Sequence, residues 1–506
     1  MKRVQVLVVG AGPAGLTVAG ELAAAGCEVR ILERRESGVQ SRAGTVLPRV
    51  LELFDYRGMA QDFISEARRI RDNPLIPFHI WAGLQPVHWR HLHSAFGHRL
   101  VLPQNTTEDL LRRRAEVLGV EMRYDTTVVG LEQTDDWVTV TAELPDGSTE
   151  QHVADYVVGA DGGRSAVRTL ADIPFPGHDG SFTGIIADVR VNMHWPEGRA
   201  MVDNEHGWAA SFPFAENGEI TRFNMVHAQR RTVPRSEPIT AAEVRNCLQD
   251  IFGREIPFTE LVWASRFTDA MRAVDDLRSG RVLLVGESAR IHYPASGVGM
   301  NFCIQDAFNL GWKLALVTGG RAADTVLDSY TQERMPVLRD LLESVRAQTA
   351  LQFNFTPEGI ALKRLVAGDL LPLPEVNRAI GLQLNGLTRA YPAAGDDHPL
   401  LGRPVPEATL QTRRGLVRLA ELLREPRLVL IDLTGGDAFR DLDLPGLVVE
   451  SGPVLASPDD FAGLTAILLR PDGYVHWVST DPVPTPAAAS VALGSWLGTP
   501  VAVAVA

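Results

Sequence analysis

The sequence predicts an α/β protein with a Rossmann-like domain, a second domain built on a sheet, and a C-terminal unit. Three observations predict this fold class. An apolar run ends in a glycine-rich turn near the N-terminus, residues 173–266 are rich in aromatic residues that alternate with period two, and strand-like runs recur after a Pro- and Gly-bearing linker at 391–406. A chain of 506 residues is long enough for about two to four domains.

The N-terminal elements form a βαβ unit. Val4–Val9 is a β-branched run that stops at Gly10, residues 15–25 have the small side chains of a packed helix, and residues 28–33 are a second apolar run. A strand, a turn, a helix and a strand in this order predict a parallel sheet.

The remaining elements follow the same two patterns. Helical periodicity predicts helices at 106–118, through 312–316, and over 324–350. The expected strands are 128–144, 153–158, 281–285, 428–433, 447–449 and 466–469. Histidines that gather between residues 73 and 102 lack the spacing of a metal site, so we expect surface or pocket-lining roles for them.

Composition excludes several classes of protein. The formal charge is −13, from 49 Lys and Arg against 62 Asp and Glu, and no basic run is longer than Arg112–Arg114, so nucleic acid is not an expected partner. Three cysteines without a CxxC pair predict neither a disulfide framework nor a thiolate metal site, and they fit a reducing cytoplasm. The first apolar run is too short for a signal peptide, and glycines and a proline interrupt the apolar stretch 486–506, so no membrane segment is expected.

The first motif is the turn GAGPAG at residues 10–15, with Glu33 at the end of the next strand. Its first two glycines let backbone N–H groups approach a pyrophosphate, and the third lets the helix lie against the strand. The helix N-terminus adds partial positive charge, and the Glu33 carboxylate can accept hydrogen bonds from ribose hydroxyls. The motif therefore predicts a dinucleotide site.

Two further motifs follow. Residues 157–168 (VVGADGGRSAVR) end a strand in a basic turn that could bring Asp161 and arginine charge to a dinucleotide. Strand 281–285 leads into GESAR at 286–290, and the loop PASGVGMN at 294–301 opens a helix. The N-terminus of that helix can stabilise an anion, such as a ring-shaped cofactor that becomes negative on reduction.

These three motifs, in this order, resemble those of the FAD-dependent class A aromatic hydroxylases, in particular the hydroxylases of aromatic polyketides such as angucyclines, anthracyclines and tetracyclines. The resemblance covers nearly the whole chain. Its C-terminal markers, HPLLGRP at 398–404 and LRPDGYV at 469–475, are similar to the thioredoxin-like domain of the polyketide hydroxylases. Because this unit has no cysteine, we expect it to be structural or to help form a homodimer rather than to perform redox chemistry.

The resemblance implies FAD and NADPH as cofactors and assigns residues to them. The residues implied to bind the cofactors are Gly10, Gly12, Pro13, Ala14, Gly15, Glu33, Arg34, Arg42, Gln104, Asp161, Gly286, Glu287, Gly297, Val298, Gly299, Met300 and Asn301. In the family, the acid of the third motif meets the ribityl chain and the loop 294–301 lies against the flavin ring. Pro294, Gly297 and Arg290 are therefore the candidate catalytic residues.

The third motif departs from the family's usual GDAAH. Its carboxylate, Glu287, is one methylene longer, and Arg290 stands where a histidine is common. We expect Arg290 either to hold a substrate oxygen or to pair with an acid such as Glu287. No metal site is expected.

The expected domains are discontinuous. The FAD-binding domain comprises 1–73, 104–173 and 267–390, the substrate-binding domain comprises 74–103 and 174–266, and the thioredoxin-like domain comprises 395–506. Phe212, Phe223 and Met225 are expected to face a flat substrate, although the core of a sheet would show the same alternation.

The expected function is that of a cytoplasmic FAD-dependent monooxygenase. With NADPH and O₂ it would hydroxylate a polycyclic aromatic polyketide through a flavin C4a-(hydro)peroxide, while the protein binds, orients and excludes water. Three alternatives stay open: Baeyer-Villiger oxygen insertion on a similar substrate, a flavin oxidoreductase that does not use O₂, and a non-catalytic flavoprotein.

Overall fold

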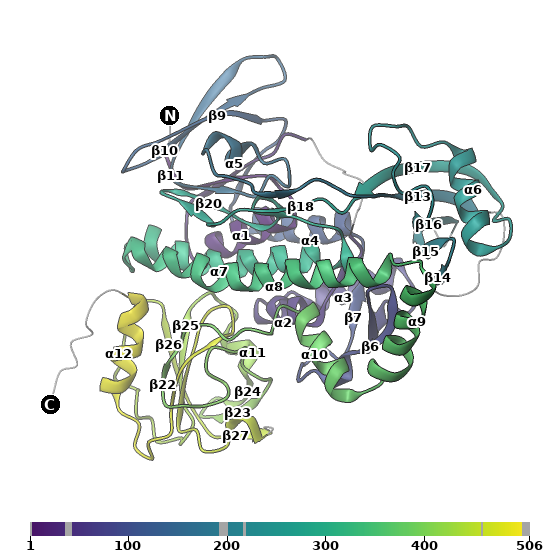
Figure 1. The fold of residues 1–506 in the computed structure, drawn as a ribbon. Coiled ribbons are helices and arrows are strands. Elements are labelled where there is room, and N and C mark those ends of the chain that lie inside the picture. The colour runs from purple at the N-terminus through teal and green to yellow at the C-terminus, as the bar shows by residue number, and fades with distance from the viewer. Residues whose placement is uncertain (1–2, 36–42, 192–200, 216–218, 457–458, 498–506) are drawn as a thin grey trace.

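Two long helices run through the middle of the molecule, α7 (Gly299–Thr318) and α8 (Asp328–Gln352). In Figure 1, the sheet that contains β1 (Val4–Val9) lies above these helices, and the C-terminal unit lies below them. The computed structural model describes residues 3–35, 43–191, 201–215, 219–456 and 459–497.

The main sheet is parallel around β1. Its order is β19-β20-β11-β1-β2-β8, and the hairpin β9-β10 extends it beside β11. The expected strand, glycine turn, helix and strand are confirmed, because β1 leads through the turn into α1 (Pro13–Ala24) and then β2. The other strands of this sheet are β2 (Val29–Leu32), β8 (Glu121–Arg123), β9 (Thr127–Gln133), β10 (Val138–Glu143), β11 (Thr149–Gly159), β19 (Arg278–Ser279) and β20 (Val282–Leu284).

Helices cover this sheet. Helix α1 packs against α7 and against α4 (Gln104–Val117), which begins two residues before the expected helix start. The expected helices over 324–350 are the short turn η5 (Asp324–Leu327) followed directly by α8. The other helices are α2 (Pro48–Tyr56), α3 (Ala60–Ile70), α5 (Ala166–Leu170), α6 (Ala241–Phe252), α9 (Pro357–Leu365), α10 (Pro374–Leu384), α11 (Leu419–Leu422) and α12 (Pro486–Leu497).

A second sheet has the order β14-β15-β16-β13-β17, and α6 packs on one of its faces. Phe212 lies opposite Arg222 in the register of β15 and β16, whereas Phe223 lies opposite Ser211. Since successive side chains alternate between faces, Phe212 and Phe223 point to opposite sides of the sheet. The strands are β13 (Thr183–Val191), β14 (Met201–Asn204), β15 (Gly207–Ala215), β16 (Ile220–His227) and β17 (Phe258–Thr268).

Short strands make three smaller sheets outside the C-terminal unit. The order of two of them is β3-β7-β4 and β12-β18-β21, and β5 and β6 form a hairpin. These strands are β3 (Thr45–Val46), β4 (Leu75–Ile76), β5 (Phe78–Trp81), β6 (Leu84–His88), β7 (Arg99–Val101), β12 (Gly177–His178), β18 (Met271–Ala273) and β21 (Arg290–Ile291).

The C-terminal unit contains a mixed sheet of order β22-β29-β28-β25-β26. Strands β25 and β26 are parallel, and β28 is antiparallel to both of its neighbours, which is the order and direction of a thioredoxin-like core. Trp496 of α12 packs edge to face on Trp312 of α7, with ring centroids 4.9 Å apart, so the last helix anchors the unit. The strands are β22 (Ala394–Gly395), β23 (Thr409–Thr412), β24 (Gly415–Arg418), β25 (Leu428–Asp432), β26 (Leu447–Ser451), β27 (Val454–Ala456), β28 (Ala466–Leu469) and β29 (Val475–Ser479).

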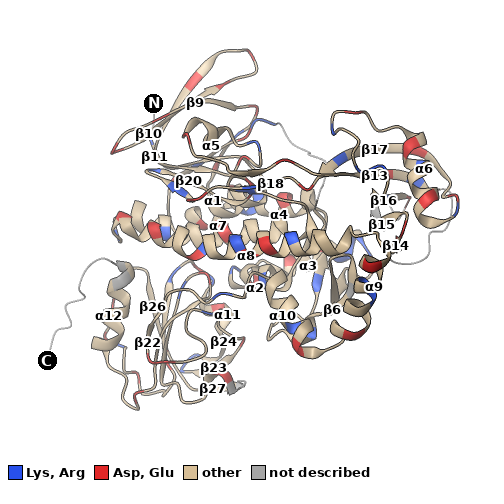
Figure 2. Ribbon diagram, viewed as in Figure 1, with Lys and Arg blue, Asp and Glu red and all other residues tan. Residues whose placement is uncertain are grey.

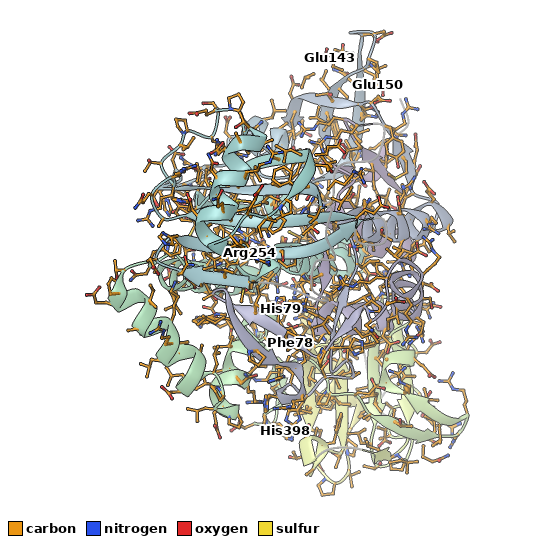
Figure 3. The ribbon with its side chains drawn as sticks, turned by 90° about the vertical axis from the view of Figure 1, so that its right-hand side faces the viewer. Phe78, His79, Glu143, Glu150, Arg254 and His398 are labelled. Carbon is orange, nitrogen blue, oxygen red and sulfur yellow. The ribbon has the colours of Figure 1, made fainter. Side chains whose placement is uncertain are left out.

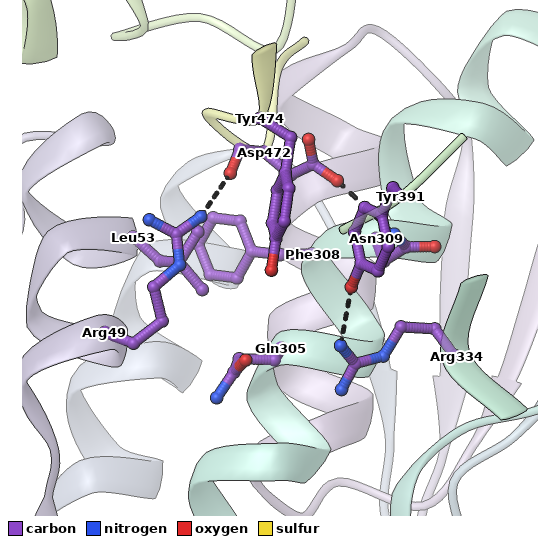
Figure 4. A pocket seen from close by; sticks show the side chains of 9 residues that line it. All are labelled: Arg49, Leu53, Gln305, Phe308, Asn309, Arg334, Tyr391, Asp472 and Tyr474. Atoms are coloured by element: carbon purple, nitrogen blue, oxygen red, sulfur yellow. Dashed lines mark hydrogen bonds between the residues drawn. The ribbon is translucent and has the colours of Figure 1, made fainter. Parts of the chain in front are cut away.

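Charged residues recur along α8, which lies above the C-terminal unit in the view of Figure 2. At this junction a cavity of about 10 Å³, room for one water molecule, lies beside Arg49, Arg334, Tyr391 and Asp472 (Figure 4). In the part of the chain that the structure describes, no helix combines the length and apolar character needed to cross a bilayer. The same residues contain no group of three or more His, Cys, Asp or Glu that could hold a metal ion.

Candidate functional site

The three sequence motifs meet at the carboxyl ends of β1, β11 and β20. A Cβ atom on Gly10 would lie 2.5 Å from the Ala160 carbonyl oxygen, which joins the first motif to the second. The hydroxyl of Ser288 donates to the Gly159 carbonyl at 2.5 Å, which joins the third motif to the second. The Ser288 hydroxyl also accepts from the Val285 N–H at 3.1 Å and so fixes the turn that carries Glu287.

The turn at residues 10–15 leaves room for a phosphate group. A Cβ on Gly15 would lie 1.9 Å from the Gly10 carbonyl oxygen, so these two positions are filled by backbone. A Cβ on Gly12 would meet nothing within 4 Å. Gly12 caps α1 with no side-chain hydrogen bond, so the first N–H groups of the helix are open to an anion. The glycine turn therefore fits the pyrophosphate of FAD.

Three other predicted cofactor residues surround this turn. The Glu33 carboxylate accepts from the Ala11 N–H at 2.7 Å and is therefore held beside the glycine turn. Gln104, the first residue of α4, accepts from the Ala43 N–H at 3.2 Å. Arg34 is exposed after β2, and Arg42 lies outside the described residues. Their contacts with a cofactor stay predictions.

Asp161 caps the helix that follows it. Its carboxylate accepts from the Ser165 hydroxyl at 2.5 Å and from the N–H groups of Ala166 and Val167 at 2.6 and 3.1 Å. These bonds fix the start of α5 and give the aspartate a structural role. Its predicted role in handling FAD and NADPH is not tested by this arrangement.

The loop 294–301 has a strained conformation held by its neighbours. Ser296 has φ 53° and Gly297 has φ 65°, and both Pro294 and Gly297 are exposed. Asn301 is buried, and its carboxamide accepts from the Leu47 N–H at 2.7 Å and donates to the Thr45 carbonyl at 3.0 Å. The loop and the segment that follows β3 are thus fixed to each other.

Helix α7 begins directly after this loop. Val298 is the N-cap residue, and its side chain makes no hydrogen bond. The first N–H groups of the helix therefore have no side-chain cap. Val298 and Met300 are buried, and Gly299 is half-buried. The helix start can favour negative charge on a group placed against the loop.

Arg290 lies in the core beneath α7. Its guanidinium is 2.6 Å from the Asp306 carboxylate, and the side chain is 2% exposed. Of the two expected roles, the structure supports the ion pair, with Asp306 as the acid rather than the exposed Glu287. The pairing with Glu287 is therefore wrong. Asp306 lies 16 residues further along the chain, on α7 and beyond the loop 294–301.

Phe223 and Met225 do not face a ligand. Both are buried in an apolar cluster with Cys247, Leu248 and Ile251 beneath α6. The ring of Phe223 packs edge to face on Phe252 at 6.1 Å. The prediction that these two residues contact the substrate is wrong, because their side chains point to the side of the sheet that α6 covers. Phe212 lies on the other face.

That other face is directed toward the loop 294–301. Phe267 lies over Gly184 on this face, and its ring centroid is 5.6 Å from Tyr293, the residue before Pro294. The Asn224 side chain points to the same side of the sheet as that of Phe212. In the register, Asn224 lies opposite Ala210 of β15 and opposite Ile186 of β13. We call this surface, which carries Trp208, Ala210, Phe212, Asn224, Ile186 and Ser265, the open face.

Asn224 was not found from the sequence. Its carboxamide oxygen is buried and has no hydrogen-bond partner. A buried acceptor without a partner costs about 1–3 kcal/mol of folding free energy. Its presence therefore needs an explanation, and a role in function is one. No motif surrounds it, and its signal in the sequence is only a polar residue within an apolar strand. A groove of about 370 Å³ runs along the edge strand β17 beside residues 235–239, and side chains from both faces of the strand line it, among them Trp263 and Ala264.

Comparison with known proteins follows this geometry. Residues 3–345 match the family described as FAD binding domain, and residues 398–500 match the family described as aromatic-ring hydroxylase, C-terminal. The chain belongs to the FAD-binding aromatic-ring hydroxylases. The resemblance inferred from the motifs, the fold class and the FAD-dependent monooxygenase activity are confirmed. FAD and NADPH are the cofactors of this family.

Relatives of this hydroxylase match it over its whole length. A Streptomyces rimosus subsp. rimosus protein named 12-dehydrotetracycline 5-monooxygenase/anhydrotetracycline 6-monooxygenase is 37% identical over 514 residues, which cover 98% of this chain and 99% of the relative. The solved structure of OxyS anhydrotetracycline hydroxylase from Streptomyces rimosus has a TM-score of 0.87 at 35% identity and covers 99% of this chain and 100% of that one. CabE, an aromatic hydroxylase from angucycline biosynthesis, has a TM-score of 0.85 at 35% identity with the same coverage.

Proposed function

We propose that this hydroxylase adds one oxygen atom to a polycyclic aromatic polyketide, with NADPH as electron donor and O₂ as oxygen donor. When bound, FAD would supply the redox chemistry, which is electron transfer from NADPH and activation of O₂. The names of the relatives support a substrate of the tetracycline or angucycline type. The observation that carries the proposal is the open face, which lies across from the loop 294–301. It presents aromatic and small side chains, the unpaired carboxamide oxygen of Asn224, and the buried ion pair of Arg222 with Asp188.

The chain's own residues bind, orient and exclude water. An aromatic cluster joins the loop to the sheet, with ring centroids 4.9–6.3 Å apart; its members are Phe182, Phe267, Tyr293 and Phe353. Apolar walls keep water from the oxygen-transfer step. The Asn224 carboxamide oxygen can accept a hydrogen bond from a phenolic hydroxyl.

The start of α7 contributes charge stabilisation. The backbone N–H groups of Gly299 and Met300 lie at a helix N-terminus next to the loop and would favour negative charge on the reduced ring of FAD. Glu33, Gln104 and the glycine turn would hold the adenosine and pyrophosphate end. In this proposal no side chain of the loop serves as acid or base toward the substrate ring.

The same proposal assigns a role to each domain. Residues 74–103 and 174–266 would bind the substrate, residues 1–73, 104–173 and 267–390 would bind FAD, and residues 395–506 would stabilise the whole or contribute to a homodimer. We also propose that the protein works in the cytoplasm, as a bacterial biosynthetic enzyme of this kind would.

The test is the fate of oxygen. FAD-loaded protein is incubated with NADPH and anhydrotetracycline or an angucyclinone under ¹⁸O₂, and in parallel without O₂. We expect probe-stimulated NADPH oxidation that requires O₂ and a product heavier by one ¹⁸O atom, present as a hydroxyl group. A lactone product would support oxygen insertion, oxidation without O₂ would support an oxidoreductase, and no NADPH oxidation with either probe would contradict the proposal.

A further inference from the structure

The turn at Ser296 is held from outside the motif by two side chains. His79, on β5, has its Nε2 atom 2.7 Å from the Ser296 carbonyl oxygen. Gln348, on α8, accepts a hydrogen bond from the Ser296 hydroxyl at 2.6 Å. Figure 3 shows Phe78 and His79 on their strand between the sheet of β13–β17 above and the C-terminal unit below.

Ser296 needs these anchors because its backbone is in the left-handed region. Its φ of 53° costs a side-chain-bearing residue about 1–2 kcal/mol relative to an ordinary conformation. Such a conformation persists only where the surroundings fix it. The carbonyl and the hydroxyl of Ser296 are each engaged by a neighbour, so the turn is held from two directions.

The anchors are themselves rigid. His79 is 3% exposed and stacks on Trp89, with ring centroids 5.4 Å apart and planes 30° apart. Gln348 also accepts from the Ala82 N–H at 3.1 Å and donates to Ser344 at 3.1 Å, so it joins the β5-β6 hairpin to α8. The hairpin, the helix and the loop form one locked unit.

We propose that His79 is a positioning residue for the flavin ring. Its Nε2–H donates to the Ser296 carbonyl and fixes Pro294–Gly297 in the conformation that lies against the ring. This inference rests on the proposed function, in that the loop faces the flavin. Without the donor, the left-handed turn relaxes, the loop loses its complementarity to the ring, and the cofactor is held less tightly.

The test compares three variants at this hairpin. His79→Phe keeps the stacking on Trp89 and loses the donor, whereas His79→Gln places an amide N–H at a similar reach. His88→Phe makes the same change on the partner strand, where the ring packs on Phe78 at 6.4 Å and makes no hydrogen bond to the loop. The measurements are the FAD dissociation constant, the visible absorption and circular dichroism of the bound flavin, and the thermal midpoint of each apoprotein.

We expect His79→Phe to raise the FAD dissociation constant about fivefold, which equals about 1 kcal/mol at 1.4 kcal/mol per factor of ten, and to change the flavin spectrum. His79→Gln should restore both to within about twofold, since a single retained hydrogen bond accounts for the difference. His88→Phe should match the parent. The apoprotein midpoints should agree among the variants, because a change that follows stability alone would indicate a merely structural role.

Two results would overturn the inference. One is parental FAD affinity and spectrum in His79→Phe; the other is a loss in His79→Gln equal to that in His79→Phe. If His79→Phe does not fold, His79→Asn, whose amide is too short to reach Ser296, takes its place in the comparison. A parent protein that binds no FAD would contradict the proposed function itself and is distinguishable from both results.

Discussion

Arg470 and Glu333 form a two-pronged ion pair across the junction between the FAD-binding part and the C-terminal unit. The two terminal nitrogens of Arg470 lie 2.7 and 2.9 Å from the Glu333 carboxylate oxygens, and each side chain is 1% exposed. Lys313 adds a contact of 2.8 Å to the same carboxylate. Burial alone would raise the pKa of Glu333, but the charges of Arg470 and Lys313 outweigh it and lower the pKa to about 2.

The first prediction concerns this pair. Glu333→Gln removes the carboxylate that pairs with Lys313 and leaves Asp472 as the one remaining carboxylate bound to Arg470, so we expect the free energy of unfolding to fall by about 3–5 kcal/mol. The measurement is denaturant unfolding of the purified protein, followed by tryptophan fluorescence. Glu343→Gln on the same helix removes an exposed pair with Arg346 and should change stability by less than about 0.5 kcal/mol. Equal effects of the two variants would contradict the role given to the junction.

The second prediction is a pH dependence from His476. Its ring is 5% exposed and packs on Trp496, and burial together with the charge of Arg470 lowers its pKa from 6.5 to about 4. Between these values the unfolded chain binds a proton that the folded protein does not, so stability falls as the pH falls from 6.5 to 4. The full effect is about 3 kcal/mol at 1.36 kcal/mol per unit.

His476→Phe isolates this contribution, because phenylalanine keeps the ring contact with Trp496 and does not titrate. We expect the loss of stability between pH 7 and pH 3.5 to be smaller in this variant than in the parent by about 3 kcal/mol. Chemical denaturation at a series of pH values measures it. His206→Phe makes the same substitution at a ring that is 57% exposed and serves as the matched control.

The third prediction separates cofactor binding from folding at the glycine turn. Gly12 has open space at its Cβ position and a φ of −78°, so Gly12→Val should leave the apoprotein folded. The valine side chain would occupy the space given to the pyrophosphate, and we expect FAD occupancy after desalting to fall by about tenfold or more, a loss of at least about 1.4 kcal/mol of binding.

Two matched variants complete that test. Gly15→Val would place a Cβ 1.9 Å from the Gly10 carbonyl oxygen. It should therefore unfold the turn itself, rather than only abolish FAD binding. Gly97→Val, at an exposed position with nothing within 4 Å, should keep full FAD occupancy. Full occupancy in Gly12→Val would refute the placement of the pyrophosphate at this turn.

Local signals in the sequence were sufficient for the FAD-binding part. The turn at Gly10, the acid Glu33 and the strand before Gly286 are each determined by neighbours within a few residues, and the structure brings their motifs together. The partner of Arg290 is different, because Asp306 reaches it only through the packing of α7 against β21. Contacts between distant elements leave no periodic pattern in one sequence.

The faces of the second sheet show the same limit. Alternation within β15 and β16 was evident, but it does not say which of the two faces a helix will cover. Helix α6, which follows β16 in sequence, covers the face of Phe223 and Met225 and leaves that of Phe212 and Asn224. The sequence shows that side chains alternate along a strand, but only the packing shows which of the two faces lies against the core.

The last prediction tests that assignment of faces at Asn224. Its buried carboxamide oxygen has no partner, so replacing it with an apolar side chain of similar volume removes a desolvation cost. We expect Asn224→Leu to raise the free energy of unfolding of the apoprotein by about 1 kcal/mol and to raise the KM for the aromatic probe about fivefold, with the FAD dissociation constant unchanged. Met225→Ala, one residue away on the covered face, should do the reverse: it should cost about 2–4 kcal/mol of stability by opening a cavity beneath α6 and leave KM near the parental value. Unfolding curves and steady-state kinetics on the two variants decide the question. A KM that rises with Met225→Ala and not with Asn224→Leu would place the substrate on the other side of the sheet.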